Sequence, residues 1–294
     1  MENFNVQPKL LVIGGSGFLG SHLVMLSQKQ GWRVYATYYQ NPPTKDKNTE
    51  YCHWIPLDIR DKGAVVGSFT SVEPDVIIHT AYTMKSDELH EVIVDGTHNI
   101  VDALERSSVR LLHISTDVVF DGEKGWYKET DPVNPINEYG RAKSEAERVV
   151  LEHTNSAVIV RTSLITGLKN QDPRTSDIRK KLQNQESIRL FTDEYRCPIE
   201  VENLAKALLE LAQLDYTGIL HVAGAKRLSR YEFGLALAEY FHLPHDPIIP
   251  SKSAESGMIR PLDCSLDLTR ARDLLKTKLK GIREVLNESR SIIR

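Results

Sequence analysis

Short apolar runs alternate with amphipathic segments along the first half of the chain. Runs rich in apolar and β-branched residues predict buried strands over 9–13, 33–38, 53–57, 75–79, 110–115 and 157–161. Apolar residues at helical spacing predict helices between them, over 18–30, 61–72, 86–106 and 138–153. Strands that alternate with helices form parallel βαβ units, whose strands are apolar throughout because helices cover both sheet faces. The pattern therefore predicts an α/β fold with a Rossmann-type, doubly wound parallel sheet.

The alternation weakens after Thr162. A polar stretch with a proline over 170–176 predicts a loop. Helices are predicted over 178–183, 201–214, 228–241, 266–275 and 282–290, and one more strand of the sheet over 218–224. Ser229 is the expected N-cap of the third of these helices. We therefore expect a dinucleotide-binding domain over 1–165 and 200–222, and a smaller C-terminal substrate lobe over 166–199 and 223–294.

Composition excludes several classes of protein. A formal net charge of −3 in 294 residues argues against a chain built to bind nucleic acid or an anionic membrane. No apolar stretch approaches the roughly 20 residues of a membrane span, and the N-terminus lacks the pattern of a secretory signal. Three scattered cysteines, Cys52, Cys197 and Cys264, indicate reduced thiols and a cytoplasmic location. No Cys/His spacing is typical of a zinc site, so we expect no metal.

Two overlapping glycine patterns follow the first predicted strand. Gly14-x-x-Gly17-x-x-Gly20 overlaps Gly15-x-Gly17-x-x-Gly20, directly before a predicted helix. Glycine permits a tight turn and a close approach of backbone to a pyrophosphate, and the helix N-terminus offers free N–H groups to the phosphates. A glycine-rich turn without a ligand is the alternative. We expect a dinucleotide to contact Gly14, Ser16, Gly17, Phe18, Leu19 and Gly20.

The end of the second predicted strand bears on the choice of dinucleotide. An acid there would bind the ribose 2′-hydroxyl and favour NAD. Residues 35–40 contain no acid, whereas Lys45 and Lys47 follow and could meet a 2′-phosphate. We therefore expect NADP(H) in preference to NAD(H), with Tyr38 at the strand end among the cofactor contacts. The alternative is that both lysines belong to a solvated loop.

Three polar residues indicate proton transfer. Tyr139 and Lys143 are four residues apart on a predicted helix, which puts both side chains on one face. Thr116 follows a predicted strand, at the edge of the sheet where ligands bind. A nearby ammonium lowers the pKa of a phenol toward neutrality, so Tyr139 could protonate a carbonyl oxygen held by Thr116 while a nicotinamide delivers hydride.

The order of several motifs supports a family resemblance. The matching segments are 14–20 (GGSGFLG), 57–59 (LDI), 115–122 (STDVVFDG), 135–143 (PINEYGRAK), 161–163 (RTS), 218–224 (GILHVAG) and Arg260-Pro261 with Ser265. The chain resembles the extended short-chain dehydrogenase/reductase family. Within that family it is similar to dTDP-4-dehydrorhamnose reductases and their sugar-nucleotide-binding relatives.

The resemblance implies a catalytic set of Thr116, Tyr139 and Lys143, with Lys143 holding the nicotinamide ribose. It implies that Asp58 and Ile59 flank the adenine and that Thr80, Ala81 and Tyr82 line the cofactor. The implied substrate is a nucleotide-linked 4-keto-6-deoxy sugar bound between two lobes, and the protein could be a homodimer. Its expected contacts are Thr116, Asp117 and Phe120, together with Arg196, whose guanidinium suits a diphosphate. For Asp117 a turn-forming role is an equal alternative.

Several positions depart from the family pattern, notably Ile93, Val118 and Leu164. Two other functions therefore stay open. One is an epimerase or dehydratase of a nucleotide sugar, and the other is a non-catalytic subunit resembling the regulatory subunit of methionine adenosyltransferase. We interpret His79 and His113, which lie in apolar strands, as hydrogen-bonded core residues. Cys197 has no placed histidine partner, so it is not expected to be a nucleophile.

Overall fold

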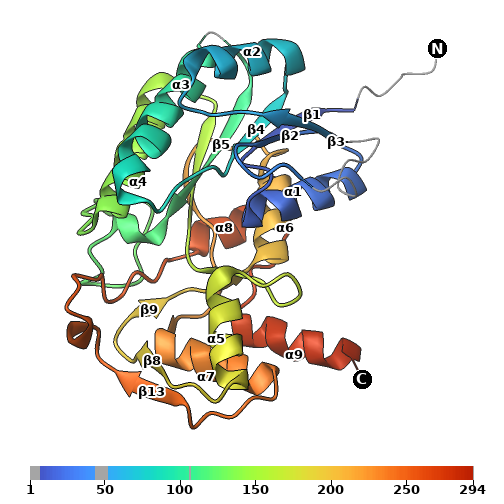
Figure 1. Cartoon of the computed structure of the whole chain (residues 1–294). Helices are drawn as coiled ribbons and strands as arrows, with labels where there is room; N and C mark the ends of the chain where they lie inside the picture. Colours follow the sequence, from blue (N-terminus) through green and yellow to red (C-terminus); the bar gives the residue numbers. More distant parts are fainter. Residues whose placement is uncertain (1–6, 44–51, 106, 294) are drawn as a thin grey trace. The chain divides into compact units, whose positions relative to one another are not determined.

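A seven-stranded sheet is the centre of the fold (Figure 1). The computed structural model describes residues 7–43, 52–105 and 107–293. Within these residues the strands of the sheet are β1 (Lys9–Ile13), β2 (Arg33–Tyr38), β3 (Cys52–Pro56), β4 (Val76–His79), β5 (Arg110–Thr116), β6 (Ala157–Thr162) and β11 (Gly218–His221). Their order is β11-β6-β5-β4-β1-β2-β3, with parallel pairing of β1 with β2 and β4, of β2 with β3 and of β4 with β5. The strand order reverses between β1 and β4, which confirms the predicted doubly wound α/β sheet.

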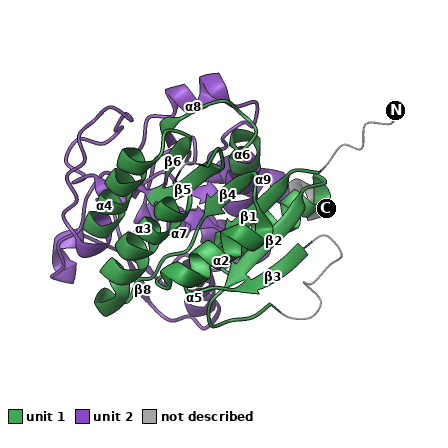
Figure 2. Cartoon of the chain, turned by 90° about the horizontal axis from the view of Figure 1, so that it is seen from above, with its two compact units in different colours: residues 1–115, 141–160, 208–219 green, residues 116–140, 161–207, 220–294 purple. Residues whose placement is uncertain are grey.

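The chain divides into two compact units, coloured separately in Figure 2. Unit 1 comprises residues 1–115, 141–160 and 208–219. Unit 2 comprises residues 116–140, 161–207 and 220–294. The two lobes expected over 1–165 with 200–222 and over 166–199 with 223–294 stay a prediction.

Helices of unit 1 cover the sheet on two faces. These helices are α1 (Phe18–Lys29), α2 (Lys62–Val72), α3 (Gly96–Ala103) and α4 (Glu138–His153) from residue 141 on, and the chain passes from unit 2 to unit 1 at residue 208, within α6 (Val201–Leu211). Leu11 and Ile13 of β1 belong to a buried cluster with residues of α2, α3 and α4, including Phe69, Ile100 and Val150. Leu10 and Val12 alternate with them and so point to the opposite face, and α1 packs against β1 and β2 (Figure 1).

One predicted helix of unit 1 is divided. Residues 86–106 were expected to form a single helix, but the structure has a 3₁₀ segment η2 (Ser86–Glu88), a π segment η3 (His90–Asp95) and then α3. The β-branched run 92–94 and Gly96 have low helix propensity. Gly96 also packs on Ile59, since a Cβ there would lie 2.7 Å from Ile59 Cδ1. The close contact of Gly96 with the loop that contains Ile59 is therefore kept, although residues 86–95 do not form a regular α-helix.

Unit 2 is built from short strands and helices. Its strand pairs are β7 (Ile165–Thr166) with β10 (Ile199–Glu200), β9 (Tyr195–Arg196) with β12 (Leu228–Ser229), and β8 (Ile188–Phe191) with β13 (Ile248–Ser251). Its helices include α5 (Pro173–Gln183), α7 (Arg230–Tyr240), α8 (Thr269–Leu274) and α9 (Ile282–Ile293), with 3₁₀ segments η4 (Asp117–Val119) and η5 (Ser253–Ser256). Ile178, Phe233, Leu237 and Ile282 join α5, α7 and α9 in one buried cluster.

Helix caps explain one success and one error in unit 2. Ser229 is the N-cap of α7, and a capping box with Glu232 confirms the prediction. The predicted loop over 170–176 is wrong in its second half, because α5 begins at Pro173. Asp172 caps that helix by accepting from the backbone N–H groups of Arg174 and Thr175, and proline is favoured in a first turn. None of the described helices combines the length and the apolarity that crossing a bilayer requires.

Replacing two glycines inside helices by alanine should have opposite effects on the free energy of unfolding. A Cβ at Gly20 of α1 would meet the Gly14 carbonyl oxygen and lie 2.8 Å from Gly15 Cα, whereas a Cβ at Gly67 of α2 would meet nothing within 4 Å. Gly20→Ala should lower the free energy of unfolding by about 1–3 kcal/mol through overpacking. Gly67→Ala should raise it by about 0.5–1 kcal/mol through helix propensity. Urea denaturation measures both, and equal effects would contradict the packing argument.

Candidate functional site

The glycine turn between β1 and α1 brings three backbone segments together. Gly14 has φ +82°, and a Cβ there would lie 2.7 Å from the Ala81 nitrogen and 2.9 Å from Thr80 Oγ1. Thr80 Oγ1 donates to the Ile13 carbonyl at 2.9 Å, and the Gly14 N–H donates to Thr37 Oγ1 at 3.0 Å. The predicted cofactor residues 14, 80 and 81 therefore lie side by side in unit 1. Gly14 needs to lack a side chain both for its backbone angle and for this contact.

The N-terminus of α1 is open for an anion. Gly17 is the N-cap and makes no side-chain cap hydrogen bond, and the first turn contains no acidic residue. Ser16 and Gly17 are exposed, while Phe18 is half-buried and Leu19 is buried. Uncapped N–H groups and the positive end of the helix dipole suit a phosphate. These residues fit a dinucleotide pyrophosphate.

The predicted adenine end is occupied by a charged pair. Arg60 binds Asp58 through Nε to Oδ1 at 2.9 Å and Nη2 to Oδ2 at 2.7 Å, and this pairing lowers the pKa of Asp58. The Arg60 guanidinium also donates to the Tyr39 hydroxyl at 2.8 Å and lies 5.3 Å from its ring centroid. Tyr38 is half-buried and Ile59 is buried, whereas Tyr82 is 59% exposed. Lys45 and Lys47, predicted to meet a 2′-phosphate, lie outside the described residues.

Lys143 is a buried ammonium next to a buried imidazole. Its side chain extends from α4, the residue is 3% exposed, and Nζ lies 3.3 Å from His113 Nε2 of β5. Burial lowers the pKa of Lys143 to about 8, which Glu147 opposes. The pKa of His113 is also lowered, first by burial and then by the Lys143 charge, so the neutral ring accepts a hydrogen bond through Nε2.

The two histidines predicted as core residues are buried, and the sequence did not reveal that they lie near Lys143. His79 and His113 are buried with ring centroids 5.1 Å apart, and burial with the Lys143 charge lowers the pKa of His79 to about 3. One turn further along α4, buried Glu147 accepts a hydrogen bond from Ser115 Oγ of β5. A polar row thus runs between α4 and β5 inside unit 1. The spacing of Glu147, four residues after Lys143, was the available signal.

Thr116 and Asp117 form a hydrogen-bonded group in unit 2. Thr116 Oγ1 donates to Asp117 Oδ1 at 3.3 Å, and Ser163 Oγ donates to Asp117 Oδ2 at 2.6 Å. Asp117 is buried, and burial raises its pKa against the opposing charge of Arg196, whose Nε lies 3.7 Å from Oδ2. Asp117 therefore orients Thr116 and Ser163. Its contact with substrate stays a prediction.

Arg196 itself is held by backbone carbonyls. The residue is 4% exposed, and its guanidinium donates to the carbonyls of Tyr195 at 2.7 Å and Pro261 at 3.0 Å. Phe120, another predicted substrate contact, is 0% exposed and stacks on Tyr127 with centroids 4.1 Å apart. In this arrangement both side chains serve the packing of unit 2.

Three arginines share one buried carboxylate in unit 2. Glu194 Oε2 accepts from Arg260 Nε at 2.6 Å, and its Oε1 lies 3.5 Å from Arg196 Nη2 and 3.7 Å from Arg230 Nε. Burial lowers the pKa of Arg230 to about 9, and nearby Arg174 adds to this effect. Positive charge exceeds negative charge around Glu194. Arg230 and Arg260, with side chains 14% and 29% exposed, are suited to an anion. Arg230 was not predicted from the sequence, and Arg260 was named only as part of a family motif.

Tyr139 and Lys143 lie four residues apart on α4, so they occupy one face of that helix. Tyr139 is half-buried. Thr116 and Tyr139 belong to unit 2 and Lys143 to unit 1, so the convergence of the three on one substrate stays a prediction.

Replacing Lys143 should change how stability depends on pH. The pKa is 10.5 in the unfolded chain and about 8 when buried, so the cost of burying the ammonium is full below pH 8 and disappears as the pH rises toward 10.5. Relative to Lys143→Met, the wild type should gain up to about 3 kcal/mol in free energy of unfolding across that window. Urea titrations at pH 7, 8.5 and 10 measure the difference, and a difference constant with pH would contradict the burial of a charged amine.

Comparisons with known proteins agree with this fold and these motifs. The family model described as the RmlD substrate binding domain matches residues 8–292. The probable low-salt glycan biosynthesis reductase Agl14 of Haloferax volcanii is 32% identical over 265 residues, which cover 85% of each chain. Methionine adenosyltransferase 2 subunit beta of Danio rerio is 27% identical over 284 residues, which cover 92% of this chain and 85% of that protein.

A solved structure shows the same architecture. The dTDP-4-dehydrorhamnose reductase of Bacillus anthracis strain Ames, crystallised with NADP, superposes with a TM-score of 0.84. The match has 23% identity and covers 96% of this chain and 98% of that one, so it shows the fold. The resemblance inferred from the motifs is confirmed: the chain belongs to the RmlD substrate binding domain family, among the dTDP-4-dehydrorhamnose reductase-like members of the extended short-chain dehydrogenases/reductases.

Proposed function

We propose that the protein is an NADP(H)-dependent reductase of a nucleotide-linked 4-keto-6-deoxy sugar. The observation that carries this proposal is Lys143, a buried ammonium one helical turn after Tyr139. Burying an ammonium is costly, and here burial outweighs the opposing charge of Glu147; buried groups with a strongly shifted pKa are frequent at functional sites. The open glycine turn in the same unit supplies the matching site for a dinucleotide.

The proposed proton transfer uses this chain's own residues. The nicotinamide would supply the hydride. Tyr139 would donate its phenolic proton to the carbonyl oxygen of the sugar, and the Lys143 charge would stabilise the phenolate that remains. His113 holds the Lys143 ammonium in place through the hydrogen bond to Nε2. Thr116 would turn its hydroxyl hydrogen from Asp117 toward the substrate oxygen and hold it.

Cofactor contacts are proposed for the residues around the glycine turn. The pyrophosphate would bind Gly14, Ser16, Gly17, Phe18, Leu19 and Gly20, and Lys143 would hold the nicotinamide ribose. Thr80, Ala81 and Tyr82 would line the cofactor, with Tyr38, Asp58 and Ile59 at its adenine end. The preference for NADP(H) rests on the absence of an acid at the end of β2. We further propose a cytoplasmic location, because Cys52, Cys197 and Cys264 are free, buried thiols; a homodimer stays a prediction.

Tyr139→Phe tests the catalytic assignment. Removing the phenolic hydroxyl should reduce kcat with NADPH and a 4-keto-6-deoxy nucleotide sugar by about 10²–10⁴-fold, because the proton donor is lost. The variant should retain the thermal stabilisation that NADPH gives the wild type, since the glycine turn is unchanged. NADPH oxidation measured at 340 nm gives the rate. Wild-type rates in this variant would remove Tyr139 from the mechanism.

The arginines around Glu194 are proposed to bind the substrate diphosphate. Arg230→Met and Arg260→Met should each raise the KM for the nucleotide sugar by roughly 10–100-fold, the value of a hydrogen bond to a charged group, without changing the KM for NADPH. Arg189→Met is the matched control, because that arginine is 69% exposed on β8. Steady-state kinetics with each substrate varied in turn measures the effect. An equal change in the control, or a change in the NADPH constant, would contradict the assignment.

A second candidate is a non-catalytic, cofactor-binding subunit. Its support is the 27% identity to methionine adenosyltransferase 2 subunit beta across 92% of this chain. The two candidates differ in turnover, because only the reductase consumes NADPH in proportion to the sugar reduced. NADPH binding without consumption on a panel of keto sugars, together with copurification of a larger enzyme, would favour the subunit. An epimerase or dehydratase would convert its sugar with no net NADPH consumption.

A further inference from the structure

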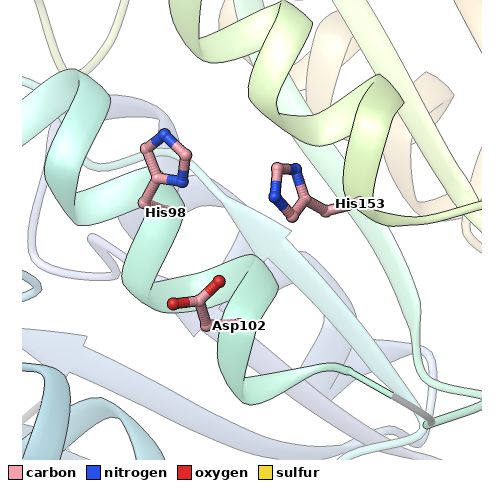
Figure 3. A group of neighbouring side chains, drawn as sticks. All are labelled: His98, Asp102 and His153. Carbon is pink, nitrogen blue, oxygen red and sulfur yellow. The ribbon is translucent and has the colours of Figure 1, made fainter.

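Two histidines and an aspartate from two helices lie together in unit 1, away from Lys143. His98 and Asp102 are four residues apart on α3, and His153 is the last residue of α4 (Figure 3). Their potential ligand atoms all lie within 4.8 Å of one another. The two imidazole centroids are 5.6 Å apart with the rings nearly perpendicular, at 81°. His98 is half-buried and the other two residues are exposed.

One histidine of the group is already oriented as metal ligands usually are. His153 Nδ1 lies 2.8 Å from the Val149 carbonyl oxygen, which can only accept, so Nδ1 carries the hydrogen and donates it. In the neutral ring this leaves a lone pair on Nε2. Metal-binding histidines commonly donate their second ring N–H to a carbonyl, because that bond sets the tautomer and the ring direction. This hydrogen bond is an observation independent of the clustering itself.

We propose that His98, Asp102 and His153 bind a divalent transition-metal ion, with Zn²⁺ as the favoured occupant. Two imidazoles and a carboxylate suit zinc, and water would fill a fourth position. Bonds of about 2.0–2.2 Å require the ligand atoms to approach to roughly 3.4 Å in a tetrahedral shell. Rotation of the exposed Asp102 side chain, with small shifts of the two imidazoles that keep the His153 hydrogen bond to Val149, can supply that movement.

The bound ion would connect two helices through residues far apart in the chain. His98 and Asp102 belong to α3 and His153 to the last turn of α4, the helix that carries Tyr139 and Lys143. Sequence spacing predicted no metal because His153 is distant from the other two, and only the packing of α3 beside α4 brings them together. The site is independent of the proposed reductase activity.

Lys62 competes for one of the ligands. Its Nζ lies 2.8 Å from Asp102 Oδ2, and the lysine side chain is 63% exposed. Exposed ion pairs contribute little, so a metal ion can displace this one. Removing the lysine charge should therefore tighten metal binding, an effect that a merely structural role of the cluster would not produce.

Calorimetric titration of the tag-free, metal-depleted protein with ZnCl₂ tests the proposal. The wild type should bind one equivalent, and its thermal unfolding temperature should rise with zinc concentration because the metal binds only the folded chain. His98→Ala and His153→Ala should each lose at least tenfold in affinity, and Lys62→Met should gain affinity. With cobalt in place of zinc, the wild type should show the visible absorption of a tetrahedral ion. The two histidine variants should not show it.

His90→Ala is the matched control. His90 is also an exposed histidine of unit 1 beside carboxylates, with Nδ1 3.4 Å from Asp95 Oδ2 and Nε2 3.9 Å from Glu145 Oε2. This variant should bind zinc as the wild type does. Circular dichroism checks that every variant is folded. Absence of a one-to-one titration in the wild type, or unchanged binding in both histidine variants, would overturn the proposal.

Discussion

Close backbone packing at the turn after β1 is the constraint on which unit 1 depends. The strand lies in the middle of the sheet, between β2 and β4, and its residues 10–13 are fully buried. The chain must leave this strand and enter α1 while touching the segment after β4 and the neighbouring strand β2. Only residues without a Cβ satisfy these contacts at Gly14 and Gly20. Gly17, between them, has no side chain to cap the first N–H groups of α1, so the turn that satisfies the packing is also chemically suited to a phosphate.

Both units bury charged side chains, and the partners of these charges differ between the units. In unit 1 a single ammonium, Lys143, faces neutral His113, with Glu147 one turn away. A neutral acceptor orients the ammonium without adding an opposite charge of its own. In unit 2 the buried carboxylate of Glu194 is shared by Arg196, Arg230 and Arg260. Asp117 also faces Arg196, so two carboxylates meet three guanidiniums, and the remaining positive charge favours an anionic ligand.

A buried network of hydrogen bonds and charges surrounds Asp117 in unit 2. Its carboxylate accepts from Thr116 and Ser163 and faces Arg196, and Arg196 in turn donates to backbone carbonyls. Each member fixes the next, which is the behaviour expected of a satisfied polar network. Thr116 is half-buried at the edge of this network, so it is the member best placed to reach a substrate. Arg230 and Arg260, whose side chains are more exposed than that of Arg196, contact Glu194 through its Oε1 and Oε2 atoms respectively.

The sequence by itself determined those helices, strands and turns whose residue pattern lies within the element. The strands of the sheet and the helix over 138–153 follow from apolar periodicity, the glycine turn from its spacing, and the start of α7 from Ser229 and Glu232. Tertiary structure alone decided which distant side chains meet. The contact of Lys143 with His113, the arginines around Glu194 and the approach of His153 to His98 depend on helices and strands packing together. Burial and long-range packing determine those contacts, and the spacing of residues close in the sequence predicts neither of them.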